Sequence, residues 1–127
     1  MARAESSPTA LSLWLPVAVY MAAIFFASSL SNPPVPSEVP DFSLHEAAYA
    51  GLTLVTIRAL ARGRWSGVTA GALAGAWIIA VLYGMTDEWH LSFVPERHAE
   101  LRDLRSDAIG ALAAVVVVKA WGIIRRL

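Results

Sequence analysis

The sequence predicts an all-α integral membrane protein with four transmembrane helices, and three observations support this prediction. Hydrophobic residues make up 57% of the 127 residues and charged residues only 16%, whereas about a quarter of a soluble domain is charged. Mean hydropathy is +0.55. The apolar residues also form runs long enough to cross a hydrocarbon core of about 30 Å. A chain of this length is expected to form one domain, residues 1–127.

Composition also excludes several classes of function. The formal net charge is zero, so nucleic-acid binding has no electrostatic support and no nucleic-acid partner is expected. The absence of cysteine excludes disulfides, thiolate metal sites and cysteine nucleophiles. Any catalysis would therefore depend on His, Asp, Glu, Ser, Thr, Tyr or Arg side chains.

The first two helices flank a proline-rich loop. Residues 11–30 are uncharged and predict a transmembrane helix. A signal peptide is the competing interpretation, but the apolar run is longer than the apolar region of a typical signal peptide, and the rest of the chain is also membrane-like. Four prolines between residues 31 and 41 prevent a helix there. The second helix is expected over residues 43–61, with Asp41 or Ser43 as its cap.

The last two helices flank a turn that contains Pro95. The third is expected over residues 65–92, and its start carries two overlapping GxxxG steps from Gly67 to Gly75. Glycines spaced in this way form a seam along which another helix backbone can approach. Pro95 should end the third helix. The fourth is expected over residues 99–124, with polar first turns and a wholly apolar stretch over 108–118.

The distribution of arginines predicts the orientation. With four spans, Arg3, the arginines at 58–64 and those at 125–126 fall on one side, whereas the loop between the first two helices has no Lys or Arg. The positive-inside rule therefore places both termini in the cytoplasm. Consequently, the polar ends of the second, third and fourth helices should meet at the outer face.

Ionisable residues near these outer ends share helix faces. Three stripes occur, one on each helix: Asp41, His45 and Tyr49; Tyr83, Asp87 and His90; and Asp103, Asp107, Gly110 and Ala114. Because Asp103 and Asp107 stand above small residues suited to close helix contact, we expect them to point into the bundle. Arg97, in the turn between the third and fourth helices, could bind two carboxylates at once.

Two blocks of sequence resemble a known family. The first, Asp41, His45 and Tyr49, matches an Asp-x-x-x-His-x-x-x-Tyr helix start. The second block consists of Tyr83-Gly84, Asp87-Glu88-Trp89-His90, Phe93-Val94-Pro95, Arg97, Asp103, Asp107 and Gly110. In order and spacing, both blocks resemble the VanZ-like membrane proteins. The chain departs from that pattern at three positions, where Phe42, Leu91 and Glu96 replace Lys, Gln and Gly.

The resemblance implies a multi-pass protein of the bacterial inner membrane. The family's named member is associated with resistance to the glycopeptide teicoplanin, and no established reaction or cofactor accompanies the resemblance. Expected partners are therefore membrane lipids together with a cell-wall precursor, a lipid headgroup or a glycopeptide antibiotic.

Four interpretations of the polar residues remain open. They could form a structural clasp that ties three helix ends together. They could bind an envelope ligand, and the residues assigned to that role are Glu88, Arg97, Asp103, Asp107, Tyr49 and Tyr83. They could catalyse hydrolysis or group transfer, with His45 or His90 as base, oriented by Asp41 or Asp87. A metal site made from His45, His90, Asp87 or Glu88 would suit a divalent ion, but no HExxH or similar signature is present, and we assign no metal and no cofactor.

Overall fold

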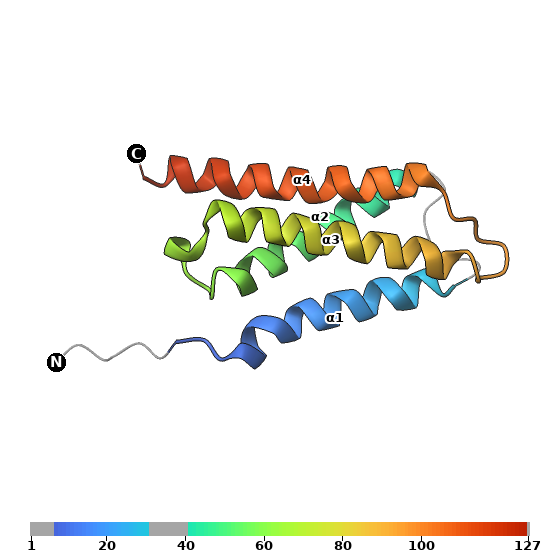
Figure 1. Cartoon of the computed structure of the whole chain (residues 1–127), viewed down its shortest axis with the longest axis horizontal. Coiled ribbons are helices and arrows are strands. Elements are labelled where there is room, and N and C mark those ends of the chain that lie inside the picture. Colours follow the sequence, from blue (N-terminus) through green and yellow to red (C-terminus); the bar gives the residue numbers. More distant parts are fainter. Residues whose placement is uncertain (1–6, 31–40, 127) are drawn as a thin grey trace.

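The structure is a computed structural model that describes residues 7–30 and 41–126, except for the side chains of residues 41–43. Within this part of the chain four α-helices form a single bundle (Figure 1). They are α1 (Ala10–Ser28), α2 (Asp41–Leu60), α3 (Ala70–Leu91) and α4 (Leu101–Ile124), and a short 3-10 helix, η1 (Trp65–Gly67), precedes α3. The predicted all-α class and the number of helices are confirmed.

Successive helices run in opposite directions (Figure 1). Helix α2 contacts the three other helices and packs most extensively against α4, whereas α1 packs against α2 and to a smaller extent against α3. The first turns of α2 and α4 therefore lie at the same end of the bundle as the last turns of α1 and α3. We call this the polar end. The opposite end holds the start of α1 and the end of α4.

Threonine side chains begin two of the helices. Thr9 accepts a hydrogen bond from the backbone N–H of Ser12, and Thr69 accepts one from that of Ala72, each at 3.1 Å. Such caps satisfy donors that have no partner within the first turn. The cap at Thr69 corrects the predicted start of the third helix, because α3 begins at Ala70 and not at residue 65. The predicted capping side chains of α2, Asp41 and Ser43, lie outside the described residues.

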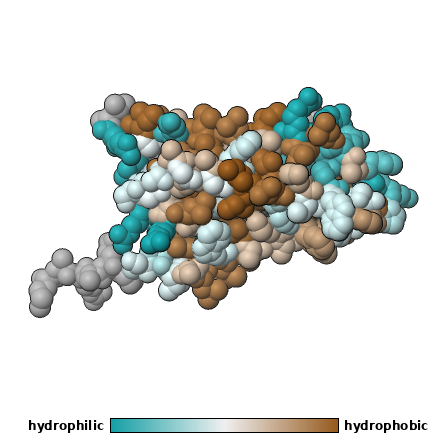
Figure 2. Space-filling model, in the orientation of Figure 1, coloured by the Kyte–Doolittle hydropathy of each residue, from teal (hydrophilic) through white to brown (hydrophobic). Residues whose placement is uncertain are grey.

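Helices α1, α3 and α4 are each long and apolar enough to cross a membrane. Helix α2 is not among the three such helices of the described chain, since His45, Glu46 and Arg58 lower its mean hydropathy. Large apolar side chains are exposed along the outside of the bundle, and Figure 2 shows them across its middle, with hydrophilic residues towards the ends. So much exposed apolar surface is typical of a protein in contact with lipid.

Helices α2 and α4 come into backbone contact at Gly110. A Cβ atom built there would lie 2.2 Å from the carbonyl oxygen of Glu46, so α2 and α4 touch backbone to backbone. The predicted glycine seam of the third helix is not a continuous helix face. Gly67 lies in η1, where a Cβ atom would lie 2.1 Å from the carbonyl oxygen of Ala61, whereas a Cβ atom at Gly71 would meet only its own capping Thr69, at 3.8 Å, among the described residues. The contact at Gly110 fixes the height of α2 against α4 close to the polar residues.

Candidate functional site

Six polar side chains from three helices meet inside the polar end. They are His45 and Tyr49 from α2, Asp87 and Glu88 from α3, and Asp103 and Asp107 from α4. We call these six residues the polar cluster. All are buried except His45, whose side chain is 12% exposed. The fourth-helix stripe faces inward as expected, with Asp103, Asp107, Gly110 and Ala114 all buried.

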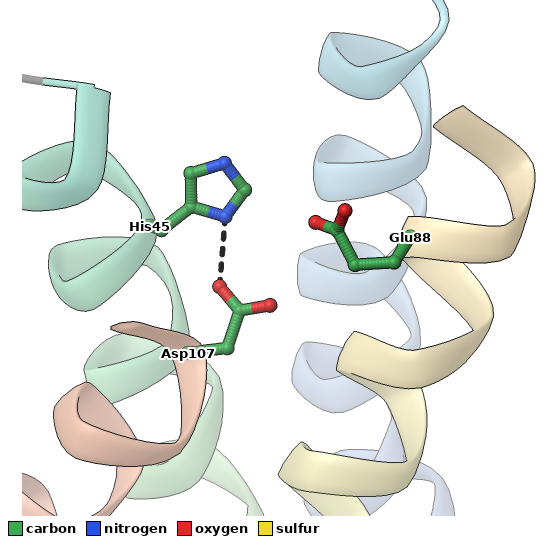
Figure 3. Close-up of side chains that lie close together, drawn as sticks. All are labelled: His45, Glu88 and Asp107. Atoms are coloured by element: carbon green, nitrogen blue, oxygen red, sulfur yellow. Dashed lines mark hydrogen bonds and ion pairs between the residues drawn. The ribbon is translucent and has the colours of Figure 1, made fainter. Parts of the chain in front are cut away.

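His45 and Asp107 form the central contact of the polar cluster. The imidazole Nδ1 lies 2.8 Å from Asp107 Oδ1 (Figure 3). On the other side of the ring, Nε2 lies 4.0 Å from Asp103 Oδ2. When Asp107 is ionised its oxygens can only accept hydrogen bonds, and Nδ1 is then the donor of this pair. The imidazole of α2 is therefore held against two carboxylates of α4.

Gly84 of α3 provides the space that Asp107 occupies. A Cβ atom at position 84 would lie 2.9 Å from Asp107 Oδ2, which is closer than ordinary contact. Asp107 is fully buried, and its Oδ2 has no hydrogen-bond partner among the described residues. Glycine at position 84 thus allows a carboxylate oxygen to sit unpaired between α3 and α4.

The two carboxylates of α3 are each satisfied at one oxygen only. Glu88 Oε2 accepts a hydrogen bond of 3.0 Å from the backbone N–H of Glu100, the residue that precedes α4. Asp87 Oδ2 accepts one of 3.3 Å from the hydroxyl of Tyr49. The remaining oxygens, Glu88 Oε1 and Asp87 Oδ1, are buried and receive no hydrogen bond from the described chain. Figure 3 shows the Glu88 carboxylate directed toward His45 and Asp107.

The polar cluster therefore holds more carboxylates than cations. It contains four carboxylic acids and one imidazole, and burial of unpaired charge is costly. Arg97 was predicted to compensate, but its Nη1 donates to the carbonyl of Leu30 at 2.7 Å. Within residues 7–30 and 41–126, Arg97 forms no ion pair with Glu88, Asp103 or Asp107. The predicted fork between Arg97 and two carboxylates is thus wrong within the described chain.

His90 and Tyr83 face α1 and not the centre of the cluster. The His90 ring stacks on Phe25 with centroids 4.1 Å apart, and its Nε2 lies 3.4 Å from Ser29 Oγ. The hydroxyl of Tyr83 donates to the carbonyl of Met21. The described contacts of His90 do not include Asp87, so the predicted His90–Asp87 pair is not formed. Whether Asp41 contacts His45 stays a prediction, because the Asp41 side chain lies outside the described residues.

Sequence reasoning missed three contributors to the site. Gly84 carries a signal, since it stands one turn before the carboxylates of α3 in the quoted motif. The backbone N–H of Glu100 carries none, because a main-chain donor is independent of residue type. The stacking of Phe25 on His90 required the packing of α1 against α3, which the sequence pattern does not specify.

A cavity lies at the opposite end of the bundle. It has a volume of about 770 Å³ and is lined by the start of α1 and the segment after α2, including Arg62 and Arg64. Arg64 donates to the hydroxyl of Ser7, and Arg58 donates to the carbonyl of Ser12. Among the described residues, its lining has no carboxylate or histidine. The described residues therefore favour the polar cluster as the candidate for acid–base chemistry.

Comparisons with family models, with curated proteins and with solved structures returned no match to this chain.

Proposed function

We propose that this chain is a multi-pass protein of the bacterial inner membrane that binds a polar component of the cell envelope in its polar end. The observation that carries the proposal is the set of three buried carboxylate oxygens that receive no hydrogen bond from the described residues: Asp87 Oδ1, Glu88 Oε1 and Asp107 Oδ2. Such oxygens favour hydrogen-bond donors or positive charge, on the ligand itself or carried with it.

The proposed topology has four spans, with α2 as the second and both termini in the cytoplasm. Helix α2 is 20 residues long, which is enough to cross the hydrocarbon core. Its buried Tyr49, Thr53 and Thr56 and its largely buried His45 lie inside the bundle, and this arrangement makes polar groups tolerable in a membrane. Its arginine, Arg58, is exposed in the last turn, at the end of the span. Helices running in alternating directions then place the polar end outside, where an envelope component can reach it.

The resemblance to VanZ-like proteins suggests the class of ligand: a cell-wall precursor, a lipid headgroup or a glycopeptide such as teicoplanin. At one position where this chain departs from that pattern, the backbone still has a conformation that suits the glycine of the pattern. Glu96 has a φ of 65°, in the left-handed region that favours glycine, and the resembling pattern has glycine at this position. A glycine at this position would suit the same backbone, and this agreement supports the proposed resemblance.

A membrane-embedded hydrolase or transferase is the second candidate, and the His45–Asp107 contact favours it. A histidine whose Nδ1 donates to a carboxylate is oriented to accept a proton at Nε2. The orienting residue would be Asp107, not Asp41 or Asp87 as the sequence suggested. This function requires turnover, so a chemically altered product distinguishes it from binding.

The experiment measures binding of purified protein in detergent to teicoplanin, to lipid-linked cell-wall precursor and to anionic lipid. Asp107→Asn should weaken binding at least about tenfold, because it removes the charge at the centre of the cluster. Glu96→Gln is the matched control, since it removes an exposed carboxylate from the adjoining turn. Equal binding by wild type and Asp107→Asn would contradict the proposal.

A purely structural clasp predicts a different result in the same variants. If the cluster only ties helix ends together, Glu88→Ala and Asp107→Ala should lower thermal stability in detergent and leave ligand binding unchanged once the protein is folded. His45→Gln separates the remaining candidates. If the wild type turns over its ligand and this variant binds it without turnover, the protein is an enzyme. If the variant keeps both ligand binding and cellular resistance to teicoplanin, an acid–base role for His45 is excluded.

A further inference from the structure

We propose that His45, Glu88 and Asp107 bind a divalent transition-metal ion, such as Zn²⁺ or Mn²⁺, between α2, α3 and α4. The three side chains each offer one ligand atom, and these atoms all lie within 4.8 Å of one another. His45 lies on α2, Glu88 on α3 and Asp107 on α4, so the ion would link these three helices at the polar end. The inference goes beyond the proposed function, because it concerns the isolated protein without any envelope component.

The spacing of the ligand atoms suits a metal ion after a small adjustment. Ligands bonded to Zn²⁺ at 2.0–2.1 Å in a tetrahedron are about 3.3 Å apart. His45 Nδ1 and Asp107 Oδ1 are 2.8 Å apart, close to that separation. Glu88 would move inward by at most about 1.5 Å, which rotation of its side chain can supply. One imidazole with two carboxylates is a donor set that favours Zn²⁺ or Mn²⁺ over Ca²⁺.

Unpaired buried oxygens provide a second and independent observation. The Asp107 side chain has no exposed surface, and its Oδ2 accepts no hydrogen bond from the described residues. Glu88 is 9% exposed, and its Oε1 likewise accepts no hydrogen bond from the described residues. Figure 3 shows both carboxylates directed into the space beside the His45 ring. A cation placed there would bind groups that otherwise lose their hydration without compensation.

A neighbouring hydrogen bond already holds Glu88 in position, and a carboxylate lies close to the far side of the His45 ring. The backbone N–H of Glu100 fixes Glu88 Oε2 and leaves Oε1 for the ion. Asp103 Oδ2 lies 4.0 Å from His45 Nε2, on the side of the ring away from Asp107. Carboxylates beyond a metal-bound histidine orient its ring and strengthen its bond to the metal. Gly84 leaves room for Asp107 Oδ2.

The test is metal binding to the purified full chain after removal of any affinity tag. Isothermal titration calorimetry with Zn²⁺ and Mn²⁺ should give one site per chain, with protons released on binding because the ion replaces the proton between His45 and Asp107. Glu88→Gln retains the hydrogen bond from Glu100 but loses the charge. This variant and Asp107→Asn should each lower affinity at least about 100-fold.

His98→Gln is the matched control, because His98 is an exposed histidine in the turn between α3 and α4. Its affinity should equal that of the wild type. Gly84→Ala removes no ligand, yet it should lower affinity by displacing Asp107 Oδ2. X-ray absorption at the zinc edge should detect one imidazole per ion, which reports on the site even if a variant loses stability.

Several outcomes would overturn the proposal. No saturable binding, equal affinity in Glu88→Gln and Asp107→Asn, or loss of binding in His98→Gln would each do so. The proposed function fails separately, since a metal-binding chain that ignores every envelope component contradicts that function alone. A chain that binds an envelope component equally well with and without a chelator, and does not bind metal, contradicts the metal site alone.

Discussion

Replacement of Gly110 by alanine should separate α2 from α4 and disrupt the polar cluster. The added Cβ would lie 2.2 Å from the Glu46 carbonyl oxygen, whereas ordinary contacts of this kind begin near 3.4 Å. The backbones must therefore move apart by about 1 Å. Glu46 is adjacent to His45, and Asp107 lies one turn from Gly110. The movement would lengthen the 2.8 Å contact between His45 and Asp107 beyond hydrogen-bonding distance.

The expected cost follows from two effects. Forcing an extra carbon into a close-packed contact costs about 1–3 kcal/mol, and loss of a hydrogen bond to a charged group costs about 1.5–3 kcal/mol. The two costs do not add in full, because moving α2 away from α4 relieves the steric contact and at the same time breaks the His45–Asp107 hydrogen bond. The total loss in the free energy of unfolding should therefore be about 2–4 kcal/mol. In a chain of this size, this corresponds to a fall in the melting temperature of roughly 5–15 °C.

Thermal unfolding in detergent, followed by circular dichroism or by size-exclusion chromatography after heating, measures this change. Gly122→Ala is the control in the same helix, because its Cβ would meet Trp65 at 3.8 Å, an ordinary contact. The control should be neutral or slightly stabilising, since alanine favours helices by up to about 1 kcal/mol. If both variants melt at the same temperature, α2 and α4 do not touch at Gly110 and the derived position of the cluster is wrong.

Three further predictions concern topology and buried hydrogen bonds. Because the chain has no cysteine, Ser92→Cys should react with an impermeant thiol reagent from outside intact cells and Ser66→Cys only after the inner membrane is opened; the reverse pattern contradicts the orientation. Tyr49→Phe removes the one described hydrogen bond to the Asp87 side chain and should cost about 1–3 kcal/mol in thermal unfolding. Trp77→Phe loses a 3.1 Å bond to an α4 carbonyl and should cost about 1 kcal/mol; no change would contradict the α3–α4 packing.

Helix number and inward faces could be predicted because they depend on periodicity alone. The spacing of Asp103, Asp107 and Gly110 already indicates a face that packs against another helix, and all three are buried. The start of α3 was placed five residues too early, because residues from 65 onward are apolar enough to continue a helix. Thr69 competes successfully as a cap there, and the preceding residues form η1 instead.

Partner choice within the cluster could not be predicted in the same way. His45 contacts Asp107, 62 residues away, and this pairing depends on how α2 is rotated about its axis against α4. Arg97 was assigned to carboxylates on charge alone. A backbone carbonyl at Leu30 binds its guanidinium instead, and no side-chain pattern indicates a main-chain acceptor. The residue type of Glu96 does not indicate its positive φ, and only the glycine at this position of the resembling pattern does so.

The orientation of α3 and α4 gives the electrostatic reason for expecting a positive partner in the polar cluster. Helix α4 directs its N-terminus to the polar end, so Asp103 in its first turn is favoured by the helix dipole. Helix α3 directs its C-terminus there, so Glu88, one turn from its capping residue Ser92, faces partial negative charge. The Glu100 N–H offsets this at one oxygen only. A carboxylate buried at this position is unfavourable for folding alone, whereas a cation shared with His45 and Asp107 would make it favourable, and this argues for ligand binding over a clasp.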